Sequence, residues 1–400
     1  ATWILNLCDN RYRFLVGFAA ALIKRQTNIL PPNKTPKALQ SIASQFPETY
    51  CLTDIESQEN LGLPVLQYPS ELKPVSKTLD IPEIAASHVA AIAFTSGSTG
   101  TPQPHLKSWD SMVRIARNTG HRLIPGDMKE VSIVATVPPQ HMYGLETSIM
   151  LPLQHKGALH GGRPFFPIDI RDALETIPPD RILITTPMHL KACIESSVKF
   201  PKISLVISAT APLSRKLAEN AERLLDTQIF EIYGCTEAGS LATRQTTKSN
   251  VWKLLDEINL TGNNDQCYIE ATYLPEPIKL PDIIKNCENG LFELQGRSAD
   301  LINIGGKRAS LRELNYHLNE IKKVEDGAYF VPPQNDHDHK RLIAFVVANE
   351  LREEDILQAL RQYLDPVFLP RPIYFVDHLP RNSSGKLTRE SLLETFSQYF

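Results

Sequence analysis

Short apolar runs alternate with amphipathic stretches through the first three quarters of the chain. Four of the runs predict strands because they are rich in β-branched and small apolar residues: HVAAIAF, VSIVATV, RILITT and KISLVISA. Between them lie segments such as residues 213–225, whose apolar positions share one helix face: Leu213, Leu217, Ala218, Ala221, Leu224 and Leu225. Strands that alternate with helices are typical of a sheet with crossover helices. The pattern therefore predicts an α/β fold.

The pattern changes near Gly296. The string GRSADLINIGGKRASLRELNYHLNEI predicts a strand, a turn at Gly305 and Gly306, and a helix. A strand candidate, LIAFVVA, and a charged helix over residues 353–363 follow. About a hundred residues suffice for a small α+β module. We expect a large N-terminal α/β domain over residues 1–296 and a small C-terminal α+β domain over residues 297–400.

Composition and charge narrow the class of function. The 400 residues carry 42 Lys and Arg against 45 Asp and Glu, a net charge of -3, so no broad basic field attracts a nucleic acid or an anionic membrane. The apolar stretch at residues 14–23 is about half of what a membrane span needs, and we interpret it as a core helix. The chain opens at Ala1 directly into an apolar run, which leaves open a processed or a truncated N-terminus. These features favour small-molecule chemistry without nucleic acid or membrane span.

The six cysteines are scattered, with no Cys-x-x-Cys pair and no His spacing that would build a zinc site. Thiols without a disulfide framework are typical of a reducing compartment. The sequence therefore favours a cytoplasmic setting.

A hydroxyl-rich loop follows the first of these strands, in the string AIAFTSGSTGTPQPHLKSW. Glycines let the backbone turn with its N–H groups converging, and hydroxyls add further donors, which suits phosphate oxygens. The predicted phosphate-binding residues are Thr95, Ser96, Gly97, Ser98, Thr99 and Gly100. Gly-Lys-Ser/Thr is absent, so the loop is not a Walker A loop. A polar turn without a ligand is the alternative interpretation.

The loop, the later string IFEIYGCTEAGS and the terminal LPRNSSGKLTRESL occur in the order found in one family. Together they resemble the adenylate-forming superfamily of acyl-CoA synthetases, peptide-synthetase adenylation domains and luciferases, over residues 91–389. The resemblance implies ATP and Mg²⁺ as cofactors, and a C-terminal domain that moves and carries the catalytic lysine. It also implies CoA or a phosphopantetheine as the thiol acceptor.

In the large domain the resemblance assigns several roles. Tyr233, with Gly234 beside it, would stack on adenine, Thr236 would donate to the α-phosphate, and Glu237 would hold Mg²⁺. A Tyr-Gly turn capped by a helix that starts at Thr236 is the structural alternative.

Two further segments would border the acyl group. His141, in PPQHMYGLETS, would lie between the acyl pocket and the nucleotide. Taken alone, it is more often a core histidine at a strand end. Small residues in SLVISATAPLS would let the adenine ring approach the backbone closely: Ser208, Ala209 and Thr210.

The resemblance extends to the end of the chain. Asp282 is the candidate for gripping both ribose hydroxyls, with Arg297 downstream. Lys386 would reach both the substrate carboxylate and the α-phosphate and neutralise the charge that keeps two anions apart. Any lysine taken alone is more often a solvated side chain, and here the position in the motif favours catalysis.

The chain departs from the family pattern at several positions. Around Asp282, KLPD replaces the usual Arg-Thr-Gly-Asp. Gln103 stands where the family has the loop lysine, and Lys107, four residues later, is the candidate to contact the outgoing pyrophosphate instead. Ala299 stands where the family has a charged hinge residue. These departures keep open a non-catalytic nucleotide-binding relic. A P-loop kinase or ATPase is the other rival, and the missing Gly-Lys-Ser/Thr argues against it.

We therefore expect a ligase that activates a carboxylic acid as its acyl-adenylate and passes the acyl group to a thiol. The short form and the opening NLCDNRYRF most resemble the ligases encoded with aryl-polyene and xanthomonadin pigment pathways. That narrower resemblance implies a hydroxybenzoate-like aryl acid as substrate and an acyl carrier protein as partner, with CoA as the alternative acceptor.

Overall fold

A computed structural model describes most of the chain: residues 2–31, 34, 36–55, 62–71, 81–95, 103–126, 128, 130–263, 266–287, 289–297, 301–304, 307–332, 342–382 and 385–399. Its packing separates two compact units. The first comprises Ala1–Ile258 with Ala271–Glu276, and the second comprises Asn259–Glu270 with Pro277–Phe400. Residues 277–296 thus pack with the second unit. The predicted boundary at residue 297 marks the start of a mobile C-terminal domain that carries the catalytic lysine. That boundary stays a prediction.

Two sheets form the first unit. One has the strand order β4-β3-β1-β2-β5-β6, formed by Val65–Gln67, Tyr50–Thr53, Trp3–Asn6, Thr27–Leu30, Val89–Thr95 and Gln103–Ser108. The other runs β13-β12-β11-β10-β9-β7-β8 within this unit, formed by Trp252–Leu254, Gly239–Arg244, Ile229–Cys235, Leu205–Ser208, Arg181–Thr185, Ser132–Ala135 and Ala158–Leu159. Most neighbouring strands are parallel, whereas β5–β6, β11–β12 and β12–β13 are antiparallel.

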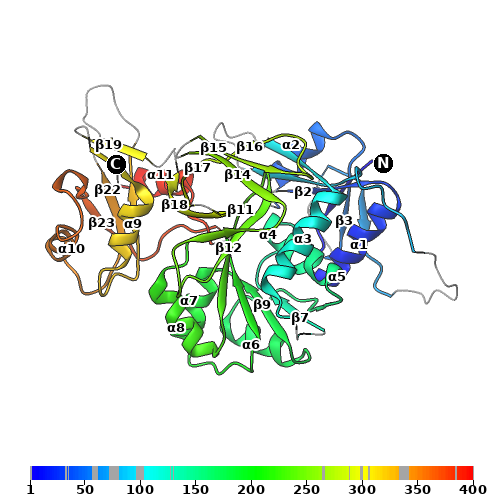
Figure 1. Ribbon diagram of the computed structural model, residues 1–400, viewed down its shortest axis with the longest axis horizontal. Helices are drawn as coiled ribbons and strands as arrows, with labels where there is room; N and C mark the ends of the chain where they lie inside the picture. The colour runs from blue at the N-terminus through cyan, green and yellow to red at the C-terminus, as the bar shows by residue number, and fades with distance from the viewer. Residues whose placement is uncertain are drawn as a thin grey trace. The chain divides into compact units, whose positions relative to one another are not determined.

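Helices connect these strands, as the alternating pattern predicts. They are α1 Arg11–Ile23, α2 Pro36–Gln45, α3 Trp109–Leu123, α4 Met142–Leu145, the π-helix η1 Glu146–Met150, α5 Leu151–Gln154, α6 Pro167–Glu175, α7 Pro187–Glu195 and α8 Arg215–Leu225. Helices α6, α7 and α8 gather on one side of the strands around β9 (Figure 1). Their apolar faces meet strand residues there in one core cluster, which includes Val134 and Val206.

Local signals set the helix ends. The Ser214 hydroxyl accepts a hydrogen bond from the Leu217 amide, so α8 begins two residues after the predicted start. Its buried face carries Ala218, Ala221 and Leu225, as the apolar spacing predicts.

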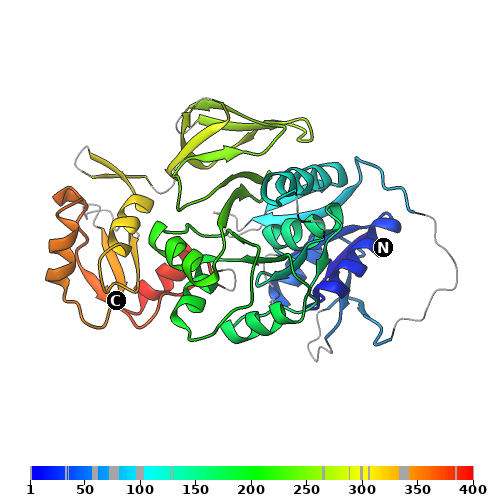
Figure 2. The same ribbon diagram turned by 60° about the horizontal axis from the view of Figure 1, so that its bottom comes forward.

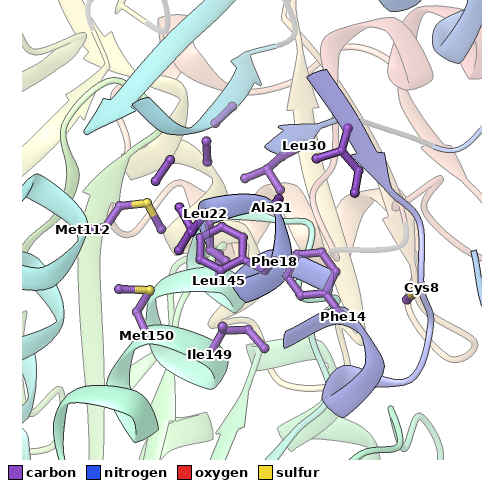
Figure 3. Close-up of a cluster of buried hydrophobic side chains, with 14 of the residues drawn as sticks. Cys8, Phe14, Phe18, Ala21, Leu22, Leu30, Met112, Leu145, Ile149 and Met150 are labelled. Atoms are coloured by element: carbon purple, nitrogen blue, oxygen red, sulfur yellow. The ribbon is translucent and has the colours of Figure 1, made fainter. Parts of the chain in front are cut away.

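The stretch predicted as a core helix is α1, and Figure 3 shows its apolar side chains beside those of the segment that follows β7. Phe14 and Phe18 of α1 are fully buried and stack at 6.3 Å between ring centroids. They share one cluster with Leu145 and Ile149. This core fixes the start of the chain against η1, which carries residues of the site described below.

The second unit contains short antiparallel elements and a three-stranded sheet. Strands β14 Ile258–Asn263, β15 Gln266–Ala271 and β16 Ile278–Lys279 form an antiparallel ribbon, drawn in yellow-green in Figure 2. Two hairpins follow, β17 Asp282–Cys287 with β18 Leu291–Arg297, and β19 Leu301–Ile304 with β20 Lys307–Ser310. The last sheet has the order β21-β22-β23, formed by Asp326–Phe330, Ile343–Val347 and Ile373–Phe375.

Helices cover both faces of this last sheet. Alternate residues of β22 face opposite ways, so Ala344 packs with α9 Leu311–Asn319 and α10 Glu353–Leu360, whereas Phe345 packs with α11 Arg389–Ser397. The short 3-10 helix Pro366–Phe368 joins the first of these clusters.

These elements confirm the predicted fold class, a large N-terminal α/β part with a smaller C-terminal α+β part. The strand and helix predicted around residues 301–319 are present, whereas Gly305 and Gly306 lie outside the described residues. The charged helix predicted to reach residue 363 ends at Leu360. All six cysteines are free thiols. Within the described ranges, no helix has both the length and the apolar character that crossing a bilayer demands.

Candidate active site

The carboxyl ends of the parallel strands in the second sheet meet at one edge. Ser208 pairs in register with Thr185 on one side and with Glu231 on the other. Ligands of open α/β sheets bind at such an edge. The structure thus brings together the small-residue segment after β10, the Tyr-Gly string at the end of β11 and the segment after β7 that contains His141.

The hydroxyl-rich loop leaves the first sheet between two paired strands. Thr95, the last residue of β5, lies opposite Gln103, the first residue of β6. The predicted phosphate-binding residues between them lie outside the described residues: Ser96, Gly97, Ser98, Thr99 and Gly100. Their role, and that of the Thr95 side chain, stays a prediction.

The Tyr-Gly-x-Thr-Glu string forms the end of β11 and the turn into β12. Gly234 is required because a Cβ there would lie 2.3 Å from the Gly239 carbonyl oxygen, and Gly239 itself has a φ of +85°. The Tyr233 ring lies 5.7 Å from the Trp252 ring between centroids, tilted by 56°. Thr236 and Glu237 occupy the turn, so the helix that was the alternative interpretation does not form at Thr236.

Glu237 fits the predicted magnesium ligand. Its side chain is 37% exposed, and Nε2 of the His105 imidazole lies 4.0 Å from its Oε1. Burial lowers the pKa of His105, and Glu237 opposes that shift. Mg²⁺ keeps several waters and takes one or two carboxylates beside substrate phosphates, so a single half-exposed carboxylate is a suitable ligand. The described residues hold no group of three or more His, Cys, Asp or Glu that would form a closed cage.

Lys107 has a protein partner in the structure. Its side chain points inward from β6 with the residue only 3% exposed, and Nζ donates to the Glu237 main-chain oxygen at 2.5 Å. Burial lowers the pKa of Lys107, and the nearby Glu146 opposes the shift. The predicted contact with pyrophosphate stays a prediction.

Glu146, which sequence reasoning missed, is buried against the same β11–β12 hairpin. Its Oε2 accepts hydrogen bonds from the Ser240 amide at 3.0 Å and from the Ser240 hydroxyl at 2.5 Å. Burial raises the pKa of Glu146 to about 7, against the opposing effects of Ser240 and Lys107. Glu146 is the first residue of the π-helix, a rare element that often marks functional sites.

His141 precedes α4 and is partly buried. Its neighbours hold the segment rigidly. The Tyr143 hydroxyl donates to the Ile207 carbonyl at 2.9 Å, and the Gln140 amide donates to the Cys8 carbonyl at 2.7 Å. A Cβ at Gly144 would lie 2.0 Å from the Pro138 carbonyl oxygen, so only glycine fits there. These contacts hold the segment that contains His141 at the end of β7, and its role beside the acyl group stays a prediction.

The small residues after β10 are also anchored. Ser208 is fully buried and Ala209 is 7% exposed, while Thr210 has a φ of +77°. Three residues further on, the Leu213 amide donates a hydrogen bond to the Glu231 carboxylate at 3.0 Å. This carboxylate was not predicted.

Glu231 has an ion-pair partner of its own. The carboxylate is bound by Arg244 with side-chain exposures of 4% and 8%, and the guanidinium lies over the Trp252 ring at 4.5 Å. The network links the small-residue segment to the ring beside Tyr233.

The predicted ribose site lies in the second unit. Asp282 begins β17, is 7% exposed, and pairs in register with Arg297 at the end of β18. The structure thus brings these two predicted positions together on one hairpin, although the Arg297 side chain lies outside the described residues. Their role with ribose stays a prediction.

Lys386 is exposed on a tight turn of the second unit. The Asn382 side chain accepts from the Lys386 amide at 2.9 Å, and Gly385 has a φ of +78°. Arg381 holds the turn, because its guanidinium donates to the Gly385 carbonyl at 3.2 Å and to both oxygens of Asp326 at 2.8 and 2.9 Å. Arg381 and Asp326 are 55 residues apart, so no local signal could have paired them.

The fold is of the α/β class, and its candidate site lies at the strand edge where such folds bind ligands. The chain belongs to the AMP-binding enzyme family, whose model matches residues 5–270, while the AMP-binding enzyme C-terminal domain matches residues 318–386. It is therefore an acyl-adenylate-forming ligase, as the motifs predicted.

Similar proteins include a 4-coumarate–CoA ligase from Halorhodospira halophila, 26% identical over 310 residues that cover 76% of each chain. Among solved structures, ATP-bound MatB from Rhodopseudomonas palustris superposes with a TM-score of 0.84 at 20% identity, over 100% of this chain and 89% of that one. The o-succinylbenzoate CoA synthetase from Bacillus subtilis, solved with ATP and magnesium ion, has a TM-score of 0.79 at 17% identity, over 98% and 89%.

Proposed function

We propose that the enzyme converts an aryl acid, of the hydroxybenzoate kind, to its acyl-adenylate with ATP, and then transfers the acyl group to a pantetheine thiol. The observation that carries the proposal is the ordered set of adenylation residues on one folded chain, with Thr236 and Glu237 held in a rigid turn and Lys386 on an exposed one.

In the first step a carboxylate oxygen of the acid attacks the α-phosphorus. The bond from that phosphorus to the bridging oxygen breaks, and pyrophosphate leaves with the electron pair. Thr236 donates to the α-phosphate, and Lys386 neutralises charge between the two anions. Tyr233 and the backbone of residues 208–210 hold adenine, Asp282 holds the ribose, and His141 borders the acid. Glu237 would hold Mg²⁺, which would supply charge neutralisation at the phosphates.

In the second step the thiol attacks the carbonyl carbon of the acyl-adenylate, and AMP leaves. AMP is a good leaving group, so the step needs no nucleophilic side chain, and the chain's task is to admit the acceptor. For this step a mobile C-terminal domain, residues 297–400, would turn, withdraw Lys386 and present the thiol.

Two considerations favour an aryl acid and a carrier-protein acceptor. A relative is named for 4-coumarate and a solved neighbour for o-succinylbenzoate, both aryl acids. The narrower resemblance to aryl-polyene and xanthomonadin ligases adds an acyl carrier protein as the acceptor, with CoA as the alternative. Those pathways define the acid class that we propose.

The test is acid-dependent exchange of pyrophosphate into ATP across a panel of aryl and fatty acids. We expect exchange with hydroxybenzoates and a loss of at least 100-fold in Lys386→Ala, on the order of other single groups that stabilise a transition state electrostatically. Lys322→Ala, which removes another exposed lysine of the same unit, should exchange like the wild type. A flat panel with folded protein that binds ATP would instead indicate a non-catalytic relic.

The acceptor is tested separately. Purified acyl-adenylate is offered to CoA and to a phosphopantetheinylated carrier protein, and thioester is counted in a single turnover. We expect faster transfer to the carrier protein. Transfer to CoA alone would contradict the acceptor that we propose while leaving adenylation intact.

A further inference from the structure

Two buried charged side chains grip the turn that carries Thr236 and Glu237. The Lys107 ammonium donates to the Glu237 main-chain oxygen on β6's side of the turn. Glu146 accepts from both the amide and the hydroxyl of Ser240, three residues further along. Three elements distant in sequence, β6, η1 and the β11–β12 hairpin, therefore meet at one turn.

The surroundings of this contact are closed. Lys107 and Glu146 are each 3% exposed, so neither presents its charge to solvent. Oε1 of Glu146 has no hydrogen-bond partner among the described residues, and a Cβ at Gly239 would lie 2.4 Å from it. A buried charge is tolerated where an opposite charge and hydrogen bonds compensate it. Lys107 and Glu146 supply this to each other, since each shifts the other's pKa toward its charged form.

The geometry also bears on what Lys107 does. An ammonium that receives a departing pyrophosphate has to turn its donors toward the nucleotide. Nζ of Lys107 instead donates to the main-chain oxygen of Glu237, the magnesium ligand in the proposed function, and the Lys107 residue is only 3% exposed. This hydrogen bond holds the backbone of Glu237, and the position of the backbone sets the direction of the Glu237 side chain. The carboxylate itself does not take part in the bond.

We propose that Lys107 and Glu146 are a buried positioning pair, which holds the 236–240 turn so that the Glu237 carboxylate and the Thr236 hydroxyl face the nucleotide. The pair acts through the turn and contacts neither substrate nor metal. The inference rests on the proposed adenylation reaction, because it assigns the turn its task there.

The test combines Lys107→Met and Glu146→Gln with a titration of Mg²⁺ in the pyrophosphate exchange assay, at pH 8. Methionine keeps the length of the side chain, and glutamine keeps its volume and one acceptor for Ser240. Each variant should raise the Mg²⁺ concentration for half-maximal exchange about tenfold, the change that loss of one hydrogen bond to a charged group produces. The KM for the acid should stay unchanged, because the pair acts on the turn and does not contact the acid.

Lys107→Met leaves the buried Glu146 carboxylate without its counterpart at pH 8, so this single variant could unfold. The double variant Lys107→Met/Glu146→Gln removes both charges and is expected to fold. Its Mg²⁺ requirement should equal that of the single variants instead of the product of the two shifts, because both residues hold one turn. Lys323→Met, which breaks an exposed ion pair with Glu350, is the matched control and should leave the titration unchanged.

A second readout separates this proposal from the proposed function. Hydrogen exchange of the wild type and the three variants, without any ligand, should show faster exchange only in peptides covering residues 229–244, even if no acid supports turnover. Unchanged exchange there would overturn the positioning pair. So would a Lys107→Met variant whose sole defect is a raised KM for pyrophosphate, beside a silent Glu146→Gln, since that pattern belongs to a direct pyrophosphate contact.

Discussion

At the scale of single residues, the site depends on polar side chains that the surrounding protein has taken out of water. Arg11 is the largest fully buried side chain, and its guanidinium donates to the carbonyls of Ala135 and Val137 and to the Ser148 hydroxyl. Burial lowers the pKa of Arg11 to about 9. These bonds tie the first helix to the end of β7 and to the π-helix. Arg11 thereby holds the chain on both sides of His141 in sequence.

Glu146 predicts a pH dependence of stability. Because burial raises its pKa to about 7 from an ordinary 4.5, the folded state binds a proton that the unfolded state has released. The free energy of unfolding should therefore fall as pH rises from about 4.5 to about 7, by roughly 2–4 kcal/mol, and level off above. Glu146→Gln cannot titrate, so the difference between the two proteins in chemical denaturation should vanish at low pH and grow toward pH 8. Parallel curves would show that Glu146 titrates normally.

At the scale of elements, the hairpins carry more of the site than the helices do. The β11–β12 turn holds Thr236 and Glu237, and the turn near the C-terminus holds Lys386. Charged side chains of the same unit hold each turn by hydrogen bonds, and we call these contacts staples. Lys107 and Glu146 hold the first turn, and Arg381 with Asp326 holds the second. Strands define where each turn emerges, and the staples define where its side chains point.

The Arg381 staple predicts a functional defect without a large loss of stability. In Arg381→Met the turn loses its bonds to Asp326 and to the Gly385 carbonyl, so Lys386 samples more positions. Pyrophosphate exchange should fall about tenfold, as expected when a catalytic group is misplaced. The ion pair is about a third exposed on each side, and we expect a change of at most about 1 kcal/mol in unfolding free energy.

Lys323→Met is the control for this prediction as well, because Lys323 and Glu350 form an exposed ion pair in the same unit. Its exchange rate should match the wild type. If Arg381→Met exchanged at the wild-type rate too, the Lys386 turn would not need the staple.

The sequence allowed the elements to be predicted, but it did not allow the side-chain contacts that hold the turns to be predicted. Periodic apolar positions predicted α1, α8 and the strands because burial repeats at a fixed spacing. The helix ends were predicted less well: α8 begins after its Ser214 cap, and the charged helix α10 ends at Leu360 instead of residue 363. The contacts of Lys107 and Glu146 with the β11–β12 hairpin and the pair Arg381–Asp326 could not be predicted, because each joins segments that are distant in sequence and that the tertiary fold brings together.

At the scale of the whole molecule, the two units have separate cores. The clusters around Phe14 and around Val206 contain only residues of the first unit. Those around Tyr329 and around Phe345 contain only residues of the second. Chemistry is divided in the same way, since the predicted nucleotide-edge residues from Ser208 to Glu237 belong to the first unit and Lys386 to the second. Stability and catalysis should therefore respond to core damage differently.

Phe345→Ala tests this separation. Phe345 is fully buried in β22 and packs with Phe330, so its truncation should cost about 3–5 kcal/mol, mainly in the second unit. Calorimetry should show a low-temperature transition split from a nearly unchanged main one. At a temperature between the two, exchange should be lost because Lys386 is no longer held, while amide hydrogen exchange in residues 181–244 stays slow. Ile92→Val, a milder truncation of a fully buried residue in the first unit, should shift the main transition alone. A single shifted transition in both variants would show that the units unfold as one, and the division of cores would then have no thermodynamic counterpart.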